Sequence, residues 1–235
     1  MTGARAGSQR RGESRPRFGV VDYGAGNLVS IEQALTRVGA DVVVVRNPSG
    51  LDGADALVVP GVGAAAPAMD RLHEAGLVDP IRAWIAKGRP FLGICLGLQL
   101  LFDGSDEDGA AGLGVVTGRT ARLENAPTLP HIGWNQVDRT RDHPAFDGIA
   151  LGADLYFVHS YAGVPSGPGA EDVVLARTTH GAPFVSAIAR DNVLGVQFHP
   201  ERSGVDGLRL LANVVALVRS GTFPMPARPR EAVRT

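Results

Sequence analysis

Short apolar runs alternate with helix-spaced segments through the first half of the chain. The runs lie at residues 18–23, 41–46, 56–59 and 91–94, and apolar residues recur every three or four positions at residues 28–38, 67–74 and 78–87. Four consecutive valines in the second run are typical of a strand covered on both faces. Strands that alternate with helices predict a parallel sheet with helices on both sides and ligands at the carboxyl ends of the strands.

The pattern changes in the second half of the chain. An acidic loop at residues 103–109 precedes runs rich in valine and glycine, which predict strands at residues 114–123, 131–137, 155–158, 173–177, 184–189 and 193–198. Ser203 is placed to cap a closing helix that ends before Gly221. The expected fold class is therefore α/β, with a mostly parallel central sheet flanked by helices and additional antiparallel strands in the second half.

Length and charge indicate one domain with two extensions. The 235 residues, 44% of them hydrophobic, can bury one full core and leave little room for a second. Residues 1–17 carry five arginines and one glutamate, a charge of +4, so the net charge of −1 leaves about −5 for the rest. We expect a disordered extension at residues 1–17, a single domain at residues 18–221 and a loose tail at residues 222–235.

Cysteine usage and hydropathy indicate a cytoplasmic protein. The single cysteine excludes an internal disulfide, so no cysteine pattern points to secretion. We expect no membrane insertion, because no apolar segment reaches the length of a membrane helix and the N-terminus has no hydrophobic signal core. The arginine-bearing N-terminus has too few charges to indicate a nucleic-acid partner.

That one cysteine, Cys95, follows the apolar run at residues 91–94 and lies between Gly93 and Gly97. Helical spacing resumes at Leu96, so Cys95 is expected at a sharp corner between a strand and a helix. A nucleophile at such a corner projects from the turn, as in the Gly-x-Ser-x-Gly elbow, and the first N–H groups of the helix favour a thiolate. A buried structural cysteine is the alternative interpretation of the same residues.

A nucleophilic cysteine needs a base, and the base needs an orienting partner. His199-Pro200-Glu201 follows the last apolar run, and residues two apart in extended backbone point to the same side. The carboxylate of Glu201 could then fix the tautomer of His199. Alternatively, the tripeptide is an ordinary strand end with a solvated histidine and glutamate.

Pro60-Gly61-Val62-Gly63 follows another predicted strand and exposes successive backbone N–H groups. Together with the N–H of Leu96, such groups could stabilise an oxyanion, at about 2.7–4 kcal/mol for each donor. The alternative is a tight strand-to-helix turn that needs glycine only for its backbone conformation.

Two further patterns indicate no cofactor or metal. Gly24-x-Gly26-x-x-Val29 lacks the third glycine of a dinucleotide-binding fingerprint, and no ribose-binding acid follows the next strand. The acidic loop departs from the calcium-loop spacing, and the chain has no paired-cysteine or His-x-x-x-His ligand set.

These motifs, in this order along the chain, are similar to those of the class I, triad-type glutamine amidotransferases. The resemblance rests on Gly93-x-Cys95-x-Gly97-x-Gln99, Pro60-Gly61-Val62-Gly63 and His199-Pro200-Glu201. Most of the family has Pro-Gly-Gly at the second motif. The Pro-Gly-Val-Gly variant resembles the glutaminase subunits of imidazole glycerol phosphate synthases in histidine biosynthesis, with support from Asp22-Tyr23-Gly24-Ala25-Gly26-Asn27-Leu28, Gly133-Trp134-Asn135, Phe157-Val158-His159-Ser160-Tyr161 and Arg202-Ser203.

The resemblance implies a role for each matching residue. Cys95 would attack the side-chain amide of glutamine and form a thioester, His199 would transfer protons, and Glu201 would orient His199. Glutamine would be held by Gln99 and by the backbone around Ser160 and Tyr161. The oxyanion donors would come from Leu96, Gly61, Val62 and Gly63.

The resemblance also implies a partner. Ammonia would pass to a separate (β/α)₈ cyclase subunit in a heterodimer, because this chain has no room for such a barrel. Asn27, Trp134 and Arg202 would face that subunit, although a tryptophan in a valine-rich sheet is more often core packing. Related subunits often carry lysine at position 202; arginine keeps the charge but changes the geometry. Glutaminase activity would stay low until the partner binds its own ligand.

Three other functions compete with this interpretation. A glutaminase subunit of anthranilate synthase would use another acceptor enzyme, and the Pro-Gly-Val-Gly and Gly-Trp-Asn motifs argue against it. A stand-alone cysteine peptidase of similar fold would have histidine directly after the nucleophile, where this chain has Leu96. In a non-catalytic binding module, Cys95 would only pack.

Overall fold

The structure, a computed structural model, describes residues 15–26 and 28–223. Its strands are β1 (Arg17–Val21), β2 (Asp41–Val45), β3 (Ala56–Val59), β4 (Phe91–Ile94), β5 (Phe102–Ser105), β6 (Val116–Arg122), β7 (His131–Arg139), β8 (Ala153–His159), β9 (Tyr161–Pro165), β10 (Val174–His180), β11 (Ala182–Arg190) and β12 (Val193–Val196). Its helices are α1 (Leu28–Arg37), α2 (Ala65–Glu74), α3 (Val78–Ala86), α4 (Leu96–Gln99), α5 (Ala170–Val173) and α6 (Gly204–Ser220), and its short 3₁₀ helices are η1 (Pro48–Leu51), η2 (Pro144–Phe146) and η3 (Pro200–Arg202).

A mixed sheet of nine strands forms the centre of the molecule, in the order β2-β1-β3-β4-β12-β11-β10-β7-β8. The strands from β2 to β12 run parallel to their neighbours. The pairs from β12 to β8 are antiparallel. The expected α/β class is confirmed, with the antiparallel strands in the second half.

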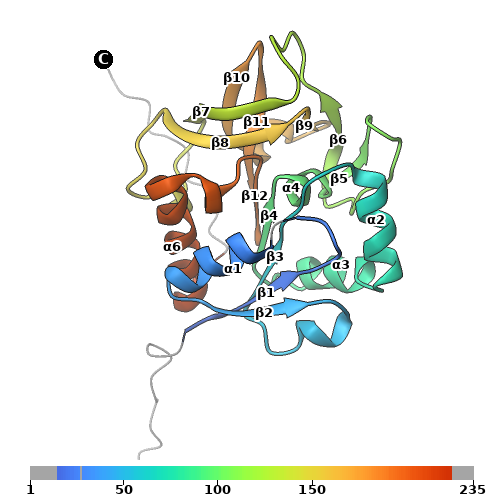
Figure 1. Cartoon of the computed structure of the whole chain (residues 1–235), viewed down its shortest axis with the longest axis vertical. Coiled ribbons are helices and arrows are strands. Elements are labelled where there is room, and N and C mark those ends of the chain that lie inside the picture. Colours follow the sequence, from blue (N-terminus) through green and yellow to red (C-terminus); the bar gives the residue numbers. More distant parts are fainter. Residues whose placement is uncertain (1–14, 27, 224–235) are drawn as a thin grey trace, which may run out of the picture.

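Helices cover both faces of the parallel strands (Figure 1). One core cluster joins α1 and α6 to the sheet through residues that include Val20 and Val58, and a second joins α2 and α3 through Val21 and Leu57. Consecutive strand residues therefore face opposite helical layers, as the twofold side-chain alternation of a strand requires.

β12, the last strand along the chain, lies directly beside β4, the strand that precedes Cys95. Val196 of β12 is opposite Ile94 of β4, and the N–H of Cys95 donates to the carbonyl of Val196 over 2.8 Å. Because the two strands are parallel and in this register, the residues that follow each of them meet at one edge of the sheet. Cys95, which follows β4, and His199 and Glu201, which follow β12, therefore lie at the same edge although they are distant in the sequence.

A second sheet, in the order β5-β6-β9, flanks the first. Neither β5 nor β9 is expected from the pattern of the sequence, because β5 lies in the acidic loop and β9 ends in proline. Both strands are held by pairing with β6, which tertiary contacts rather than intrinsic propensity provide.

Three local features agree only in part with expectation. β2 is an edge strand, and most of its valines are only partly buried, although Val42 and Val43 pack against the two opposite core clusters, so both of its faces are covered in part. α4 has only four residues, so its dipole near Cys95 is weak. Ser203 is the N-cap residue of α6, as expected, but its side chain makes no capping hydrogen bond; its hydroxyl donates to the carbonyl of His199 over 2.6 Å and accepts from the N–H of Tyr156 over 2.9 Å.

The folded region begins earlier and ends later than the domain expected at residues 18–221. α6 ends at Ser220, and the next residue, Gly221, has φ 68°, as expected for a glycine that terminates a helix. Arg17 already belongs to β1, and Phe223 is buried, so the folded region exceeds residues 18–221 on both sides. Residues 1–14 and 224–235, which hold most of the two expected extensions, lie outside the described residues. None of the described helices is long and apolar enough to span a membrane.

Candidate active site

Cys95 occupies a strained backbone corner between β4 and α4. Its φ of 53° and ψ of −108° lie in a region that residues other than glycine rarely adopt. The carbonyl of Cys95 accepts hydrogen bonds from the N–H groups of Leu98 and Gln99, which closes the first turn of α4. The predicted elbow is therefore present, and its strain is of the kind that active sites retain.

His199 and Glu201 lie next to each other beyond the end of β12. Nδ1 of His199 is 2.8 Å from Oε1 of Glu201, and both side chains are buried. Glu201 reaches His199 from the short helix η3, so the expected pairing is present although its cause is a turn and not extended backbone. Nε2 of His199 has no partner of standard hydrogen-bond geometry among the described residues, and it interacts electrostatically with Cys95.

The Pro-Gly-Val-Gly segment (residues 60–63) approaches the corner from the end of β3. The N–H of Leu96 donates to the carbonyl of Gly61 over 3.3 Å. The hydroxyl of Tyr23 donates to the carbonyl of Pro60 over 2.8 Å and fixes the start of the segment. One expected oxyanion donor, the N–H of Leu96, is therefore occupied by the carbonyl of Gly61 in this conformation.

A cavity of about 220 Å³ opens beside the nucleophile. Five residues expected at the site line it, namely Gly63, Cys95, Gln99, Ser160 and Tyr161. Drug-sized ligands occupy about 300–1,000 Å³, so this smaller cavity suits a ligand of amino-acid size. Among the described residues, no group of three or more His, Cys, Asp or Glu side chains is placed to hold a metal ion.

Comparison with known proteins agrees with this geometry. The family described as glutamine amidotransferase class-I matches residues 19–217. The imidazole glycerol phosphate synthase subunit HisH of Synechococcus elongatus is 46% identical over 209 residues, which cover 87% of this chain and 95% of that protein. HisH of Moorella thermoacetica is 48% identical over 201 residues, which cover 85% and 94%. The chain belongs to the class-I glutamine amidotransferases.

Solved structures share the fold. PurLQS from Thermotoga maritima superposes with a TM-score of 0.68 at 19% identity, over 86% of this chain and 98% of that one. A structure described as a glutamine amidotransferase superposes with a TM-score of 0.65 at 26% identity, again over 86% and 98%. Class-I amidotransferases are enzymes, so the interpretation of this chain as a non-catalytic binding module is wrong.

The surroundings of His199 in this amidotransferase keep its imidazole protonated. Burial by itself lowers the pKa of His199, but the charge of Cys95 and the hydrogen bond and charge of Glu201 outweigh burial and raise the pKa to about 10. At neutral pH the imidazole is therefore positive and carries a proton that it can transfer.

Two neutral histidines, His131 and His159, form a hydrogen-bond chain that ends at the carbonyl of Tyr161 in the wall of the cavity. Nδ1 of His159 lies 2.8 Å from the carbonyl of Tyr161, and its Nε2 lies 3.3 Å from Nδ1 of His131. Burial is the main cause that lowers the pKa of His159 to about 3 and that of His131 to about 4. Because both imidazoles are neutral, His159 donates to Tyr161 and accepts from His131. The carbonyl of Tyr161 thus has a fixed position and accepts a second hydrogen bond, from Nε2 of Gln99 over 2.7 Å.

Two residues of the site, Tyr23 and Gln197, were not expected there from the sequence, although Tyr23 belongs to one of the matching motifs. Tyr23 holds residue 60 as described above, and its pKa is raised well above its ordinary value, chiefly by burial and further by the charge of Cys95. Gln197 contacts both Cys95 and Gln99. A signal for Gln197 exists: it lies two residues before His199, and residues two apart in extended backbone share a side.

Of the three residues expected at a partner interface, the structure describes Trp134 and Arg202. The side chain of Trp134 is 56% exposed, so its interpretation as core packing is wrong. The guanidinium of Arg202 lies 4.2 Å from the ring centroid of Tyr156, and the Tyr156 ring packs edge-on against that of Trp134. Asn27 lies outside the described residues. The interface role of all three residues stays a prediction.

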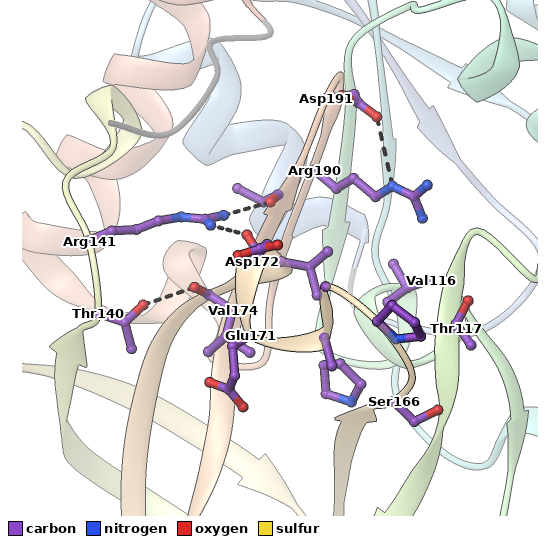
Figure 2. Close-up of a pocket in the computed structure, with 16 residues that line it drawn as sticks. Val116, Thr117, Thr140, Arg141, Ser166, Glu171, Asp172, Val174, Arg190 and Asp191 are labelled. Carbon is purple, nitrogen blue, oxygen red and sulfur yellow. Dashed lines mark hydrogen bonds and ion pairs between the residues drawn. The ribbon is translucent and has the colours of Figure 1, made fainter. Parts of the chain in front are cut away.

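A larger hollow, of about 830 Å³, is lined by residues that include Arg141, Asp172 and Arg190 (Figure 2). The terminal nitrogens of Arg141 donate to the carbonyls of Asp172 and Ala189, and Nε of Arg190 pairs with Asp191, while Nε of Arg141 has no hydrogen-bond partner among the described residues. None of the residues expected at the active site lines it. Volume alone therefore does not identify the active site of this amidotransferase.

The raised pKa of His199 predicts a pH-dependent contribution to stability. A group with a pKa near 6.5 in the unfolded chain and about 10 in the folded chain stabilises the fold fully below pH 6.5, and this stability is lost as the pH rises through 10. We expect the difference in free energy of unfolding between the wild type and His199→Gln to fall over this range in urea titrations.

The control is the same comparison in a Cys95→Ala background. Cys95 is a main cause of the raised pKa, so the pH dependence should shrink there. A wild-type difference that stays constant from pH 6.5 to 10 would contradict the charge assigned to His199.

Proposed function

We propose that this chain is the glutaminase subunit of an imidazole glycerol phosphate synthase and hydrolyses glutamine through a thioester on Cys95. The observation that carries the proposal is the buried Cys95 at a strained corner, facing the His199–Glu201 pair and sharing a cavity with Gln99. Relatives of that name at 46% and 48% identity support it, since each alignment spans more than nine-tenths of the relative.

The chemistry follows from the charges of the site. The sulfur of Cys95 attacks the amide carbon of the glutamine side chain, a carbon–sulfur bond forms, and the carbonyl electrons move to oxygen. Protonated His199 gives its proton to the departing nitrogen, so the carbon–nitrogen bond breaks and ammonia leaves. Neutral His199 then takes a proton from water, which attacks the thioester and releases glutamate. Glu201 orients His199 and stabilises its charged form throughout.

Gln99, Ser160 and Tyr161 supply the substrate contacts in this proposal. They line the cavity that Cys95 faces, which is the place where the side-chain amide of a bound glutamine must lie. The amide of Gln99 is already fixed by the carbonyl of Tyr161, so it is preorganised to orient the amino-acid end of the substrate.

We propose that the ammonia passes to a separate cyclase subunit with a (β/α)₈ barrel, in the cytoplasm. The relatives are named as subunits of a synthase, which supports a partner. Trp134 and Arg202 offer an exposed aromatic and a cation next to the site, since Arg202 directly follows Glu201, and residues of this kind often dominate interface energies. Asn27 is assigned to the same interface by resemblance alone.

The occupied N–H of Leu96 supports an activation step. While the carbonyl of Gly61 accepts from Leu96, this donor is unavailable to an oxyanion. Rotation of the peptide between Gly61 and Val62 would free Leu96 and turn the N–H of Val62 toward the site, next to Gly63. Loss of one oxyanion donor typically costs about 10²–10³ in rate, so the isolated subunit should be a poor glutaminase.

The test is glutamine hydrolysis by the subunit alone, by the complex with its cyclase, and by the complex with the cyclase ligand bound. We expect the last rate to exceed the first by about 10²-fold or more, because one or both donors are then available. Product formation from added ammonia serves as the control, because it depends on the cyclase only. Equal hydrolysis rates in all three conditions would contradict the proposed activation.

A further inference from the structure

A buried amide connects the nucleophile with Gln99. Gln197 is the first residue after β12, and its side chain is completely buried. Its Nε2 lies 3.6 Å from Sγ of Cys95, and its Oε1 lies 3.1 Å from Nε2 of Gln99. The register of β12 against β4 causes this placement, because Val196 is opposite Ile94 and Gln197 is therefore next to Cys95.

The hydrogen-bond chain fixes which end of the Gln197 amide faces the sulfur. The carbonyl of Tyr161 can only accept, so the group of Gln99 that faces it over 2.7 Å is the NH₂ group. The same NH₂ group faces Gln197, so the atom of Gln197 that meets it is the oxygen. The NH₂ group of Gln197 consequently points at Cys95.

We propose that Gln197 is a further catalytic residue, which donates an N–H to the sulfur of Cys95, favours its thiolate, and links the sulfur to Gln99 in the substrate cavity. This inference rests on the proposed glutaminase function. A hydrogen bond donated to a charged form stabilises that form. The carbonyl of Val158, 3.9 Å from Sγ, is an acceptor for the neutral thiol and acts in the opposite sense over a longer distance.

Other groups around Cys95 also act on its charge. His199 and Tyr23 interact with it electrostatically, and Glu107 and His159 line the same cavity. Gln197 differs from all four because its amide is uncharged at every working pH. Its replacement therefore removes a donor to the sulfur without removing a charge or another titrating group from the site.

The test is the pH dependence of Cys95 alkylation by iodoacetamide, measured by mass spectrometry. Gln197→Met keeps the length of the side chain but has neither donor nor acceptor. We expect the inflection of the alkylation rate to rise by about one pH unit, so that alkylation below the inflection slows about tenfold. Gln99→Met should shift the inflection in the same direction by a smaller amount, because Gln197 then loses the partner that orients its amide.

Thr178→Val is the matched control. Thr178 lies in the same sheet on β10, is 2% exposed, and its hydroxyl has no hydrogen-bond partner among the described residues. Like Gln197→Met, this variant removes a buried polar group, yet the alkylation profile should match that of the wild type. If it shifts as far as the profile of Gln197→Met, a general effect of the sheet explains the result and the proposal is overturned.

An unchanged inflection in folded Gln197→Met would also overturn the proposal, with folding checked by circular dichroism. If that variant does not fold, the shorter Gln197→Leu decides by the same measurement. Alkylation needs neither glutamine nor a partner subunit. Failure of the glutaminase proposal would leave the shift intact, whereas failure of this inference would leave glutamine hydrolysis by the wild-type complex intact.

Discussion

Cys95→Ala should abolish product formation from glutamine and leave product formation from ammonia unchanged. The thioester cannot form without the sulfur, and removal of a nucleophile from a catalytic unit costs on the order of 10⁴–10⁶ in rate. Alanine fits the site, because Cys95 is buried at 4% exposure and the substitution removes one atom only. The measurement is a synthase assay of the complex with cyclase, with either glutamine or ammonium salt as the nitrogen source.

The ammonia reaction is the internal control of this experiment, because it requires an intact complex and no glutaminase chemistry. Loss of both reactions would show that Cys95 matters for assembly and would contradict the assigned role. Retention of glutamine-dependent activity within tenfold of the wild type would contradict the thioester.

Gly97→Ala should be among the most destabilising single substitutions in the chain. A Cβ at position 97 would lie 1.7 Å from the carbonyl oxygen of Val59 on β3, an atom that no side-chain rotation can move. Overpacking that only backbone movement can relieve costs about 3 kcal/mol or more, at the upper end of its usual range. We expect a loss of this size in the free energy of unfolding, measured by urea denaturation.

Gly88→Ala separates this clash from conformational strain. Gly88 has φ +72°, and a Cβ there would meet no atom within 4 Å, so only the left-handed backbone conformation opposes alanine. That conformation costs a residue other than glycine about 1–2 kcal/mol. If Gly97→Ala lowers the free energy of unfolding no more than Gly88→Ala does, close packing of α4 against β3 is not the reason that position 97 requires glycine.

The local pattern of the sequence predicted the parallel half of the fold well. β3 and β4 begin and end at the residues that their apolar runs define, since each run is bounded by turn residues and buried on both faces. β5 and β9 could not be predicted, because they are strands only through pairing with β6. The length of α4 could not be predicted either, because Leu100 and Leu101 keep helical spacing after the helix has ended.

Residues of the candidate site could be predicted where the residue type by itself indicates a catalytic role. Cys95, His199 and Glu201 stand out as a nucleophile, a base and a carboxylate, and the structure brings them together. Gln197 does not stand out by its type: its position two residues before His199 is a weak signal, and its place beside Cys95 follows only once the strand is known to lie beside β4. Whether the N–H of Leu96 is occupied depends on the direction of the carbonyl of Gly61, which the residue types do not determine.

The sequence by itself thus determined the α/β class, the elbow at Cys95 and the candidate catalytic residues, because hydrophobic periodicity and turn residues act over a few neighbouring positions. The tertiary structure alone decided that β12 returns to lie beside β4. This pairing joins positions about a hundred residues apart, so it depends on the packing of the whole sheet and on no local signal. It places His199 and Gln197 next to Cys95, and it therefore decides whether the strained cysteine is a nucleophile or only part of the core.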